Sequence, residues 1–265
     1  MMLTSLPMLQ WLLICGVGFG ASLLTFFSGF GLGTLLLPAF ALFFPAEAAL
    51  MMTAVVHLLN NGFKITLLYR FVDRSVLLRF GLPAIVAAVG GSALLVNLSG
   101  AEPIFEYTLA EREFAVRPVG LVIGLLMVAF ALRELADLKG GRGFDPKWLP
   151  VGGLVSGFFG GLSGHQGALR SAFLMKAGLG KEAFLATGVA VAILVDLGRL
   201  SLYLPAAGEL ARDAPLGLLA AATLSAFAGA ALGRRLLHKV TLVSVYRVVG
   251  VFLIAAGLLI AAGVI

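Results

Sequence analysis

The chain has 265 residues, of which 60% are hydrophobic and only 12% carry a charged side chain. This charged share is about half that of an ordinary soluble domain, which needs a polar coat around its core. The composition therefore excludes soluble enzymes, disordered proteins and nucleic-acid binders, and it indicates a multi-pass membrane protein. The formal net charge of +6 then reports basic cytoplasmic loops rather than a nucleic-acid partner.

Polar residues divide the chain into apolar segments that predict an all-α fold with 8–10 membrane segments. These segments cover residues 9–27, 35–44, 46–69, 75–98, 118–137, 148–163, 168–178, 180–204, 214–233 and 241–263. Two of them, 35–44 and 168–178, are too short to cross a hydrocarbon core about 30 Å thick. Each follows a glycine-rich break, at 28–34 and 163–167, which predicts a helix, a break and a half-helix in both places.

The charges of the loops predict the orientation in the membrane. Loops 70–79, 138–147 and 234–239 are basic and are expected on the cytoplasmic side. The linker 99–117 is acidic on balance and 205–213 is mixed, so both are expected outside. This assignment is consistent only if both termini lie on the outer, periplasmic side of the inner membrane.

The two halves of the chain look related. A shift of 134 residues aligns Gly33 with Gly167 and Thr53 with Thr187, and the order of glycine break, half-helix and long helix also repeats. The sequence therefore predicts two repeats of about five membrane segments each, within a single transport domain.

The first repeat is expected at 1–138 and the second at 148–265, joined by a cytoplasmic linker at 139–147. The first starts outside and the second starts at the cytoplasmic linker, so the two have opposite topology. Inverted repeats are typical of secondary transporters, whose substrate site lies near the midplane of the membrane.

Segment 46–69 carries four polar residues at the helical spacing 0, 3, 4, 7: His57, Asn60, Asn61 and Lys64. This spacing puts all four on one helix face. Such a stripe either lines a cavity or forms a hydrogen-bonded packing seam between helices. Lys64 can also extend to the cytoplasmic interface, because Arg70 follows six residues later.

Segment 180–204 contains Asp196 and Arg199, which can pair directly at the i, i+3 spacing. The pair can be a structural lock between helices. Alternatively, Asp196 neutralises an arginine that binds substrate, or it carries a coupling proton. His57 and His165 are further candidates for proton coupling, because histidine titrates near physiological pH.

The second break combines Gly164, His165, Gln166 and Gly167 with Arg170 in the first turn of the half-helix. The first N–H groups of that helix lack intrahelical partners and favour an anion. A cation so close to them is reasonable if a negative group binds between, although Arg170 can instead pair with Asp196 or cap carbonyl groups. These five residues are predicted to bind substrate.

The first break supplies a second set of candidate substrate-binding residues, which are Gly29, Gly31, Gly33 and Thr34. Asn60 and Asn61 are expected to add hydrogen bonds. The deep positively charged residues Lys64, Arg170 and Arg199 outnumber the single deep acid, which suits a small anion. A cation channel would need rings of Asp or Glu instead.

Small-xxx-small spacing at Gly16/Gly20 and at Gly157/Gly161 predicts close helix contacts. The lone cysteine, Cys15, can form no internal disulfide and no zinc site, so neither a metal nor a cofactor is expected. No phosphate-binding G-x-x-x-x-G-K-[ST] motif is present in the sequence, so the energy for transport must come from a gradient or a partner.

These motifs resemble the TauE/SafE family of membrane permeases, the sulfite exporters or toluene sulfonate uptake permeases. The resemblance rests on the glycines of 28–33 followed by Pro38, on Asn60-Asn61, on Gly90-Gly91 and on the stretch 160–164. It implies an inner-membrane transporter of sulfite, sulfonates or related small anions. His165-Gln166 replace common glycines and Arg170 replaces a common apolar residue, which leaves the identity of the anion open.

The sequence therefore predicts a secondary transporter that moves a sulfur-containing or carboxylate anion by alternating access. Its expected partners are that anion, the lipid bilayer and H+ as a candidate coupling ion, and a homo-oligomer is a further candidate. One alternative is a passive anion channel. Another is an intramembrane transferase that uses His57 and His165.

Overall fold

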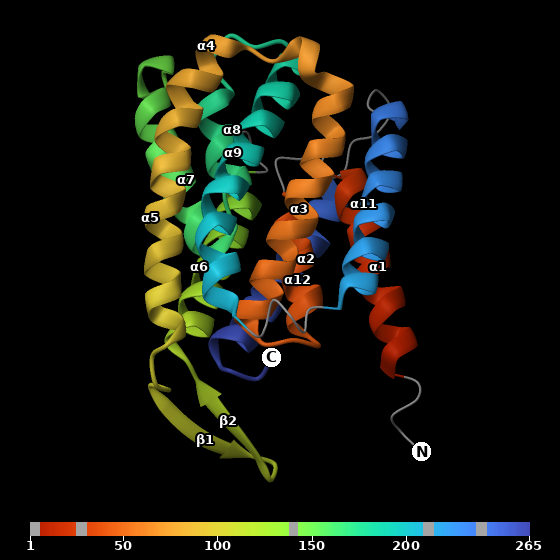
Figure 1. Cartoon of the computed structure of the whole chain (residues 1–265), viewed down its shortest axis with the longest axis vertical. Helices are drawn as coiled ribbons and strands as arrows, with labels where there is room; N and C mark the ends of the chain where they lie inside the picture. The colour runs from red at the N-terminus through yellow and green to blue at the C-terminus, as the bar shows by residue number, and fades with distance from the viewer. Residues whose placement is uncertain (1–5, 25–30, 138–142, 209–214, 237–242) are drawn as a thin grey trace.

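The computed structural model describes residues 6–24, 31–137, 143–208, 215–236 and 243–265. Its helices form a bundle in which most run along the long axis (Figure 1). In chain order they are α1 (Leu6–Leu24), α2 (Leu32–Ala41), α3 (Ala46–Leu68), α4 (Arg74–Val76), α5 (Leu82–Ser99), α6 (Pro118–Asp137), α7 (Leu149–Ser163), α8 (Gly167–Leu174), α9 (Lys181–Ala207), α11 (Leu216–Leu236) and α12 (Val243–Ala261). Short helical turns lie at η1 (Tyr69–Phe71), η2 (Leu77–Gly81) and η3 (Pro146–Trp148).

Among the described residues, four helices are long and apolar enough to span a membrane: Arg74–Ser99, Pro118–Ala136, Lys181–Ala206 and Leu216–Arg235. The first of these combines α4, the π-helical turn η2 and α5. Shorter apolar helices lie at Met8–Leu24, Leu32–Ala41 and Arg247–Ala261. The multi-pass membrane class that the composition predicted is confirmed.

The fold is not helical throughout, because the acidic linker folds into a β-hairpin. Strands β1 (Phe105–Leu109) and β2 (Arg112–Val116) pair antiparallel, with Tyr107 opposite Phe114. Apolar side chains alternate with polar ones along β1, a strand pattern that the charge-based interpretation overlooked. The hairpin projects beyond the end of the bundle, and the Tyr107 hydroxyl donates to the Ala262 carbonyl at 2.8 Å (Figure 1).

Two half-helices were predicted, and both are present with slightly earlier starts than expected. Helix α2 has 10 residues and α8 has 8, which are about 15 Å and 12 Å long at 1.5 Å per residue. A β-carbon on Gly152 would overlap the ring of Phe173, and one on Gly160 would lie 3.0 Å from Gln166 Cβ. Helix α8 therefore runs back antiparallel along α7 from a break inside the bundle.

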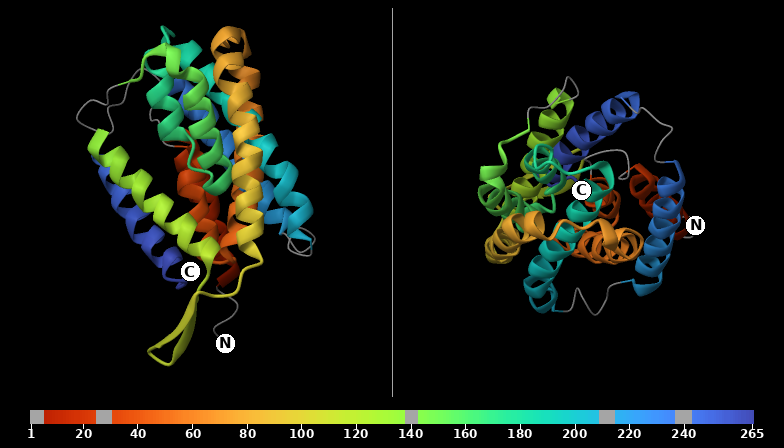
Figure 2. Two further views of the ribbon diagram at one scale, coloured as in Figure 1. Left: turned by 90° about the vertical axis from the view of Figure 1, so that its left-hand side faces the viewer. Right: turned by 90° about the horizontal axis from the view of Figure 1, so that it is seen from above.

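The helices of the first half pack mainly on helices of the second. Helix α5 packs along α7, α1 along α11, α6 along α12 and α3 along α9. Figure 2 shows α6 and α12 side by side along one flank of the bundle. The α3–α9 contact brings buried polar residues of both helices together, among them His57 and Asp196.

Glycines allow α5 and α7 to approach until their backbones touch. A β-carbon on Gly157 would overlap the Ala84 carbonyl oxygen, and one on Gly161 would overlap that of Ala88. The predicted close contact at Gly157/Gly161 is confirmed, and Gly153 makes the same approach to Phe80.

The corresponding prediction for Gly16/Gly20 is wrong. No described atom lies within 4 Å of a β-carbon placed on either residue. The residue of α1 that α11 approaches is Gly18, whose β-carbon would lie 3.2 Å from the Ala222 carbonyl oxygen. Small-xxx-small spacing identified the right helix but the wrong face of it.

The basic stretches gather at one end of the bundle. The turn at α4, the start of α7 and the end of α11 lie there, while the start of α1, the end of α12 and the β-hairpin lie at the other end (Figure 1). Arg74, Lys147, Arg234 and Arg235 belong to the first group. This grouping into two ends agrees with the charge pattern.

Candidate functional site

A buried ionic cluster joins α3 to α9. The Nδ1 atom of His57 lies 2.6 Å from Oδ2 of Asp196. The other carboxylate oxygen, Oδ1, accepts from Arg199 Nε at 3.1 Å and lies 2.8 Å from Nη2. Asp196 and Arg199 have no exposed surface, and a buried charge is stable only when it is paired in this way. The i, i+3 pair predicted from the sequence is confirmed, and a histidine from the other half of the chain completes it.

The polar stripe on α3 divides between two neighbouring helices. Asn61 Nδ2 lies 3.1 Å from His57 Nδ1, so these two residues belong to the ionic cluster. The amide of Asn60 faces α11: with its oxygen accepting from Lys64 Nζ at 3.2 Å, its nitrogen donates to the Ala226 carbonyl at 3.2 Å. Asn60 therefore bonds across the contact between α3 and α11, as the packing-seam interpretation predicted, and Lys64 bonds to Asn60 on the same helix.

The second break brings backbone against the guanidinium of Arg199. Gly164 ends α7 in the left-handed conformation, with φ of 78°. A β-carbon on it would lie 2.8 Å from Arg199 Nη1. Glycine is needed here for both reasons, since other residues disfavour this conformation and a side chain would displace the guanidinium.

The first break reaches the same place from the other half of the chain. A β-carbon on Gly33 would lie 3.8 Å from His57 Cδ2 and 3.9 Å from the Gly164 carbonyl oxygen. One on Gly31 would lie 3.9 Å from His57 Nε2. The two glycine breaks therefore meet beside His57.

Two other predicted residues of the first break have different outcomes. Thr34 is buried in the first turn of α2, where its amide donates to the Gly31 carbonyl at 3.1 Å. Gly29 lies outside the described residues.

Arg170 lies beside the cluster and holds Gln166. Its Nη1 donates to Gln166 Oε1 at 3.1 Å, and its Nε would lie 3.5 Å from a β-carbon on Gly188 of α9. Neither of the sequence-based alternatives, an ion pair with Asp196 or a capped carbonyl, is among its hydrogen bonds in the described part of the chain. Because the amide oxygen of Gln166 faces Arg170, the amide NH2 points elsewhere.

His165 is fixed by a hydroxyl and an aromatic ring. Its Nδ1 lies 3.2 Å from the Ser163 hydroxyl, and its ring stacks on Phe130 of α6 with centroids 5.9 Å apart and planes 3° from parallel. Helix α6 thus contributes to the site, a role that no sequence motif indicated.

Several buried polar atoms around the breaks have no hydrogen-bond partner among the described residues. They are Thr53 Oγ1, His165 Nε2, Gln166 Nε2 and Arg199 Nη1. Buried polar groups are nearly always paired, and each unpaired one costs about 1–3 kcal/mol. Arginine and glutamine nitrogens can only donate, so the site offers unused donors and a positive charge.

Thr53 is the residue of this set that the sequence indicates only through its alignment with Thr187 in the second repeat. It lies four residues before His57, so the two share a helix face. Its Cγ2 would lie 3.6 Å from a β-carbon on Gly33. The signal that could have found it is this i, i+4 spacing to a buried histidine.

Within the described parts of the chain, no group of three or more His, Cys, Asp or Glu side chains is placed to hold a metal ion. The chemistry that the site does support is the binding of a small, negatively charged group by nitrogen and hydroxyl donors.

Comparison with known proteins identifies the class. Residues 14–260 match the family described as Sulfite exporter TauE/SafE, which is nearly the whole chain. The protein therefore belongs to this family, and membership implies a membrane transporter of sulfur-containing anions rather than an enzyme. No curated protein matches the chain.

Proposed function

We propose that the protein is a secondary transporter that carries a small sulfur-containing anion across the inner membrane by alternating access. The observation that carries this proposal is the buried Nη1 of Arg199, which has no hydrogen-bond partner among the described residues and lies against Gly164. A guanidinium nitrogen buried in this way is best explained by an anion that occupies the space in another step of the cycle.

Three groups are placed to share that anion. Arg199 supplies charge, while Gln166 Nε2 and Thr53 Oγ1 supply hydrogen bonds. The first N–H groups of α8 add the positive end of a helix dipole. Arg170 acts as a positioning residue, because its bond to Gln166 Oε1 leaves the NH2 group of that amide available.

Glycine contacts support two repeats. A β-carbon on Gly91 of α5 would overlap the Phe158 carbonyl oxygen and lie 2.9 Å from Leu162 N. A β-carbon on Gly229 of α11 would overlap the Phe19 carbonyl oxygen and lie 3.2 Å from Leu23 N. The two contacts use the same residue types. Gly229 follows Gly91 by 138 positions, while Phe158 and Leu162 follow Phe19 and Leu23 by 139 positions.

Helices α6 and α12 add a reciprocal contact. A β-carbon on Gly124 would overlap the Gly257 carbonyl oxygen, and one on Gly257 would lie 2.8 Å from the Gly124 carbonyl oxygen. Two copies related by a two-fold axis contact each other in this way.

The α7–α8 hairpin enters the bundle from the basic end and the α1–α2 hairpin from the opposite end (Figure 1). These directions support repeats of inverted topology, at 1–138 and 148–265 around a cytoplasmic linker at 139–147, with both termini on the periplasmic side. Such repeats give the two alternative openings that a carrier needs.

The ionic cluster supports coupling to protons. Asp196 holds Arg199 with one oxygen and His57 with the other, so a proton that binds to this pair changes the charge next to the anion. Ionisable residues at this depth in transporters commonly act as proton relays. We propose H+ as the coupling ion on this ground.

Counterflow in proteoliposomes tests the proposal. Vesicles loaded with unlabelled sulfite should take up radiolabelled sulfite with saturation and trans-acceleration, and sulfite should be recovered chemically unchanged. Thiosulfate, an alkylsulfonate and acetate as competitors would define the substrate class. Ohmic conductance without trans-acceleration would favour the channel, and conversion of the substrate would favour the transferase.

The Arg199→Gln variant should lose counterflow while it still reaches the membrane. The matched control is Arg234→Gln, because Arg234 is exposed at the end of α11 and should be dispensable. Counterflow that is the same in both variants would contradict the proposed site.

A further inference from the structure

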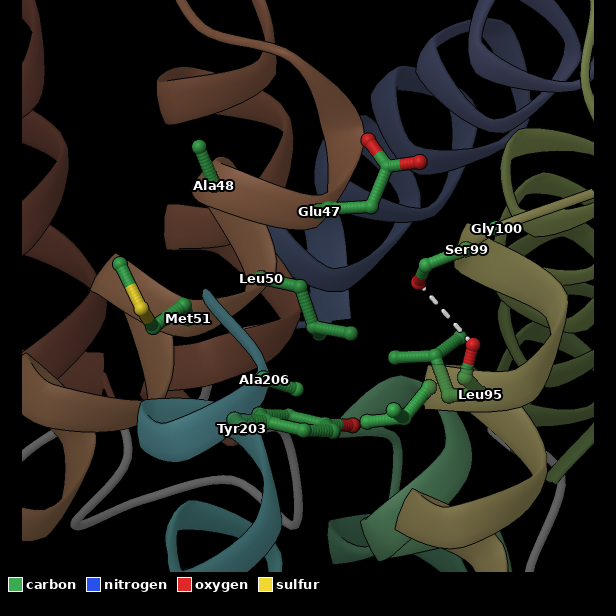
Figure 3. A pocket seen from close by; sticks show the side chains of 10 residues that line it. Glu47, Ala48, Leu50, Met51, Leu95, Ser99, Gly100, Tyr203 and Ala206 are labelled. Carbon is green, nitrogen blue, oxygen red and sulfur yellow. Dashed lines mark hydrogen bonds between the residues drawn. The ribbon is translucent and has the colours of Figure 1, made fainter. Parts of the chain in front are cut away.

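A cavity of about 520 Å³ lies between the start of α3 and the ends of α5 and α9 (Figure 3). These helix ends lie at the same end of the bundle as the β-hairpin (Figure 1). The volume falls within the range of small-molecule sites, roughly 300–1,000 Å³. The cavity is lined by Glu47, Ala48, Leu50, Met51, Leu95, Val96, Ser99, Gly100, Tyr203 and Ala206.

The lining of this cavity does not fit a binding site for an anion. Most of its side chains are apolar, and the one charged residue among the described residues that line it, Glu47, is acidic. A carboxylate repels an anion in a partly desolvated space. The cavity therefore fits a passage through which an anion moves better than a place where it is held.

The walls of the cavity continue inward to the ionic cluster. On α3, Leu50 is followed by Thr53 and then by His57, at spacings of three and four residues on one helix face. On α9, Tyr203 lies four residues after Arg199, so the same face carries both. The cavity and the ionic cluster therefore lie one after the other along the same contact between α3 and α9.

Leu50 lies at the boundary between the cavity and the ionic cluster. It lines the cavity, yet it is only 1% exposed. Its Cδ1 would lie 3.6 Å from a β-carbon on Gly164, the same point that lies 2.8 Å from Arg199 Nη1. One leucine side chain thus separates the cavity from the unpaired guanidinium nitrogen.

Tyr203 completes the boundary from the other wall. It lines the cavity, and its hydroxyl donates to the Gly161 carbonyl of α7. This bond ties the outer part of α9 to the helix that ends in the second break. The boundary is closed in this structure, since both side chains are buried.

We propose that the cavity is the outer vestibule of the transport path and that Leu50 is the side chain that closes it above the anion site. The inference rests on the proposed function for the anion site and for the outward orientation of this end. Opening requires α3 to move away from the end of α7 so that Leu50 leaves Gly164, which agrees with alternating access.

Cysteine labelling tests the proposal without measuring transport. In a Cys15→Ser background, a cysteine is placed in the vestibule (Ser99→Cys) or below the boundary (Thr53→Cys). Intact cells receive the membrane-impermeant anion 2-sulfonatoethyl methanethiosulfonate. We expect fast labelling at position 99 and slow labelling at 53, and Leu50→Ala should raise the rate at 53 by about tenfold or more without changing the rate at 99.

The control is Leu95→Ala, which enlarges the same cavity from α5. Leu95 is buried like Leu50, at 3% exposed, but it does not lie at the boundary. The atoms nearest to the β-carbon position on Gly164 belong to Leu50 and Arg199. Leu95→Ala should therefore leave the rate at position 53 unchanged. If Leu50→Ala does not accumulate in the membrane, Leu50→Val replaces it and should give a smaller increase.

The outcomes of this experiment distinguish a failure of the proposed gate at Leu50 from a failure of the proposed transport function. Equal rates at position 53 with Leu50 intact and truncated would overturn the gate, while the counterflow loss in Arg199→Gln would still support the anion site. Labelling at positions 53 and 99 from inside-out vesicles only would overturn the outer vestibule and the proposed topology. Labelling needs no bound anion, so a protein that fails in counterflow can still pass this test.

Discussion

Arg199 packs so closely against Gly164 that there is no room for a side chain at position 164. The Nη1 atom of Arg199 lies 2.8 Å from the position of a β-carbon on Gly164, which holds φ at 78°. These two residues lie 35 positions apart and connect the second break to the ionic cluster. The break is therefore shaped around a guanidinium.

The Gly164→Ala variant should lose counterflow and unfold at a lower temperature. Its left-handed backbone costs roughly 1–2 kcal/mol for any residue with a β-carbon, and the clash with Arg199 adds to that cost. The matched control is Gly178→Ala, because Gly178 has φ of 74° and no described atom lies within 4 Å of its β-carbon position. Thermal unfolding in detergent and counterflow should separate the two, and equal losses would show that backbone strain alone matters.

The Asp196→Asn variant should be strongly destabilised and should no longer respond to a pH gradient. Removing one partner of a buried ion pair typically costs about 3–5 kcal/mol, because the other charge stays buried. Uptake with an inward-acid gradient divided by uptake without one should fall to unity in this variant. The control is Asp145→Asn, which removes only an exposed ion pair with Lys147 at 4.0 Å. The free energy of unfolding should therefore change by less than about 1 kcal/mol.

The Gly157→Ala variant should destabilise the contact between α5 and α7. The added methyl group would overlap the backbone of Ala84, which no rotamer change can relieve, so we expect a loss of about 1–3 kcal/mol or more. Gly90→Ala on α5 is the control, since no described atom lies within 4 Å of its β-carbon and alanine favours a helix more than glycine does. A melting temperature that falls equally in both variants would contradict the backbone contact.

The Glu47→Gln variant should take up the anion with a lower KM. Glu47 lines the vestibule, and a like charge at a partly exposed site is worth roughly 0.5 kcal/mol, which corresponds to about a twofold change in KM. The difference from the wild type should shrink at high salt, where charges are screened. An unchanged KM at low salt would mean that the anion does not pass Glu47.

Local patterns were sufficient to predict the second break, the half-helices and the Asp196–Arg199 pair. Each depends on residues close together in the sequence: glycines that interrupt an apolar run, and opposite charges at helical spacing. Asp196 lies inside an apolar helix and needs a partner of opposite charge, and Arg199 is only three positions away.

Relations between distant segments could not be predicted in this way. The bond between His57 and Asp196 spans 139 positions and depends on which face of α3 meets α9. The same dependence explains why Asn60 turns toward α11, and why Arg170 holds Gln166 beside the site while the fully buried guanidinium is that of Arg199. Helical spacing specifies a face, but the neighbouring helix that covers it is decided by packing of the whole bundle.

The β-hairpin has a practical consequence for imaging. Its tip, at Ala110 and Glu111, projects beyond the helices, and the bond from Tyr107 to Ala262 ties the hairpin to the segment that follows α12 (Figure 1). A small domain grafted at this tip, or an antibody fragment raised against it, would emerge from a detergent micelle at a defined angle. Electron micrographs of single particles could then be aligned on that rigid marker, which a bare helical bundle does not provide.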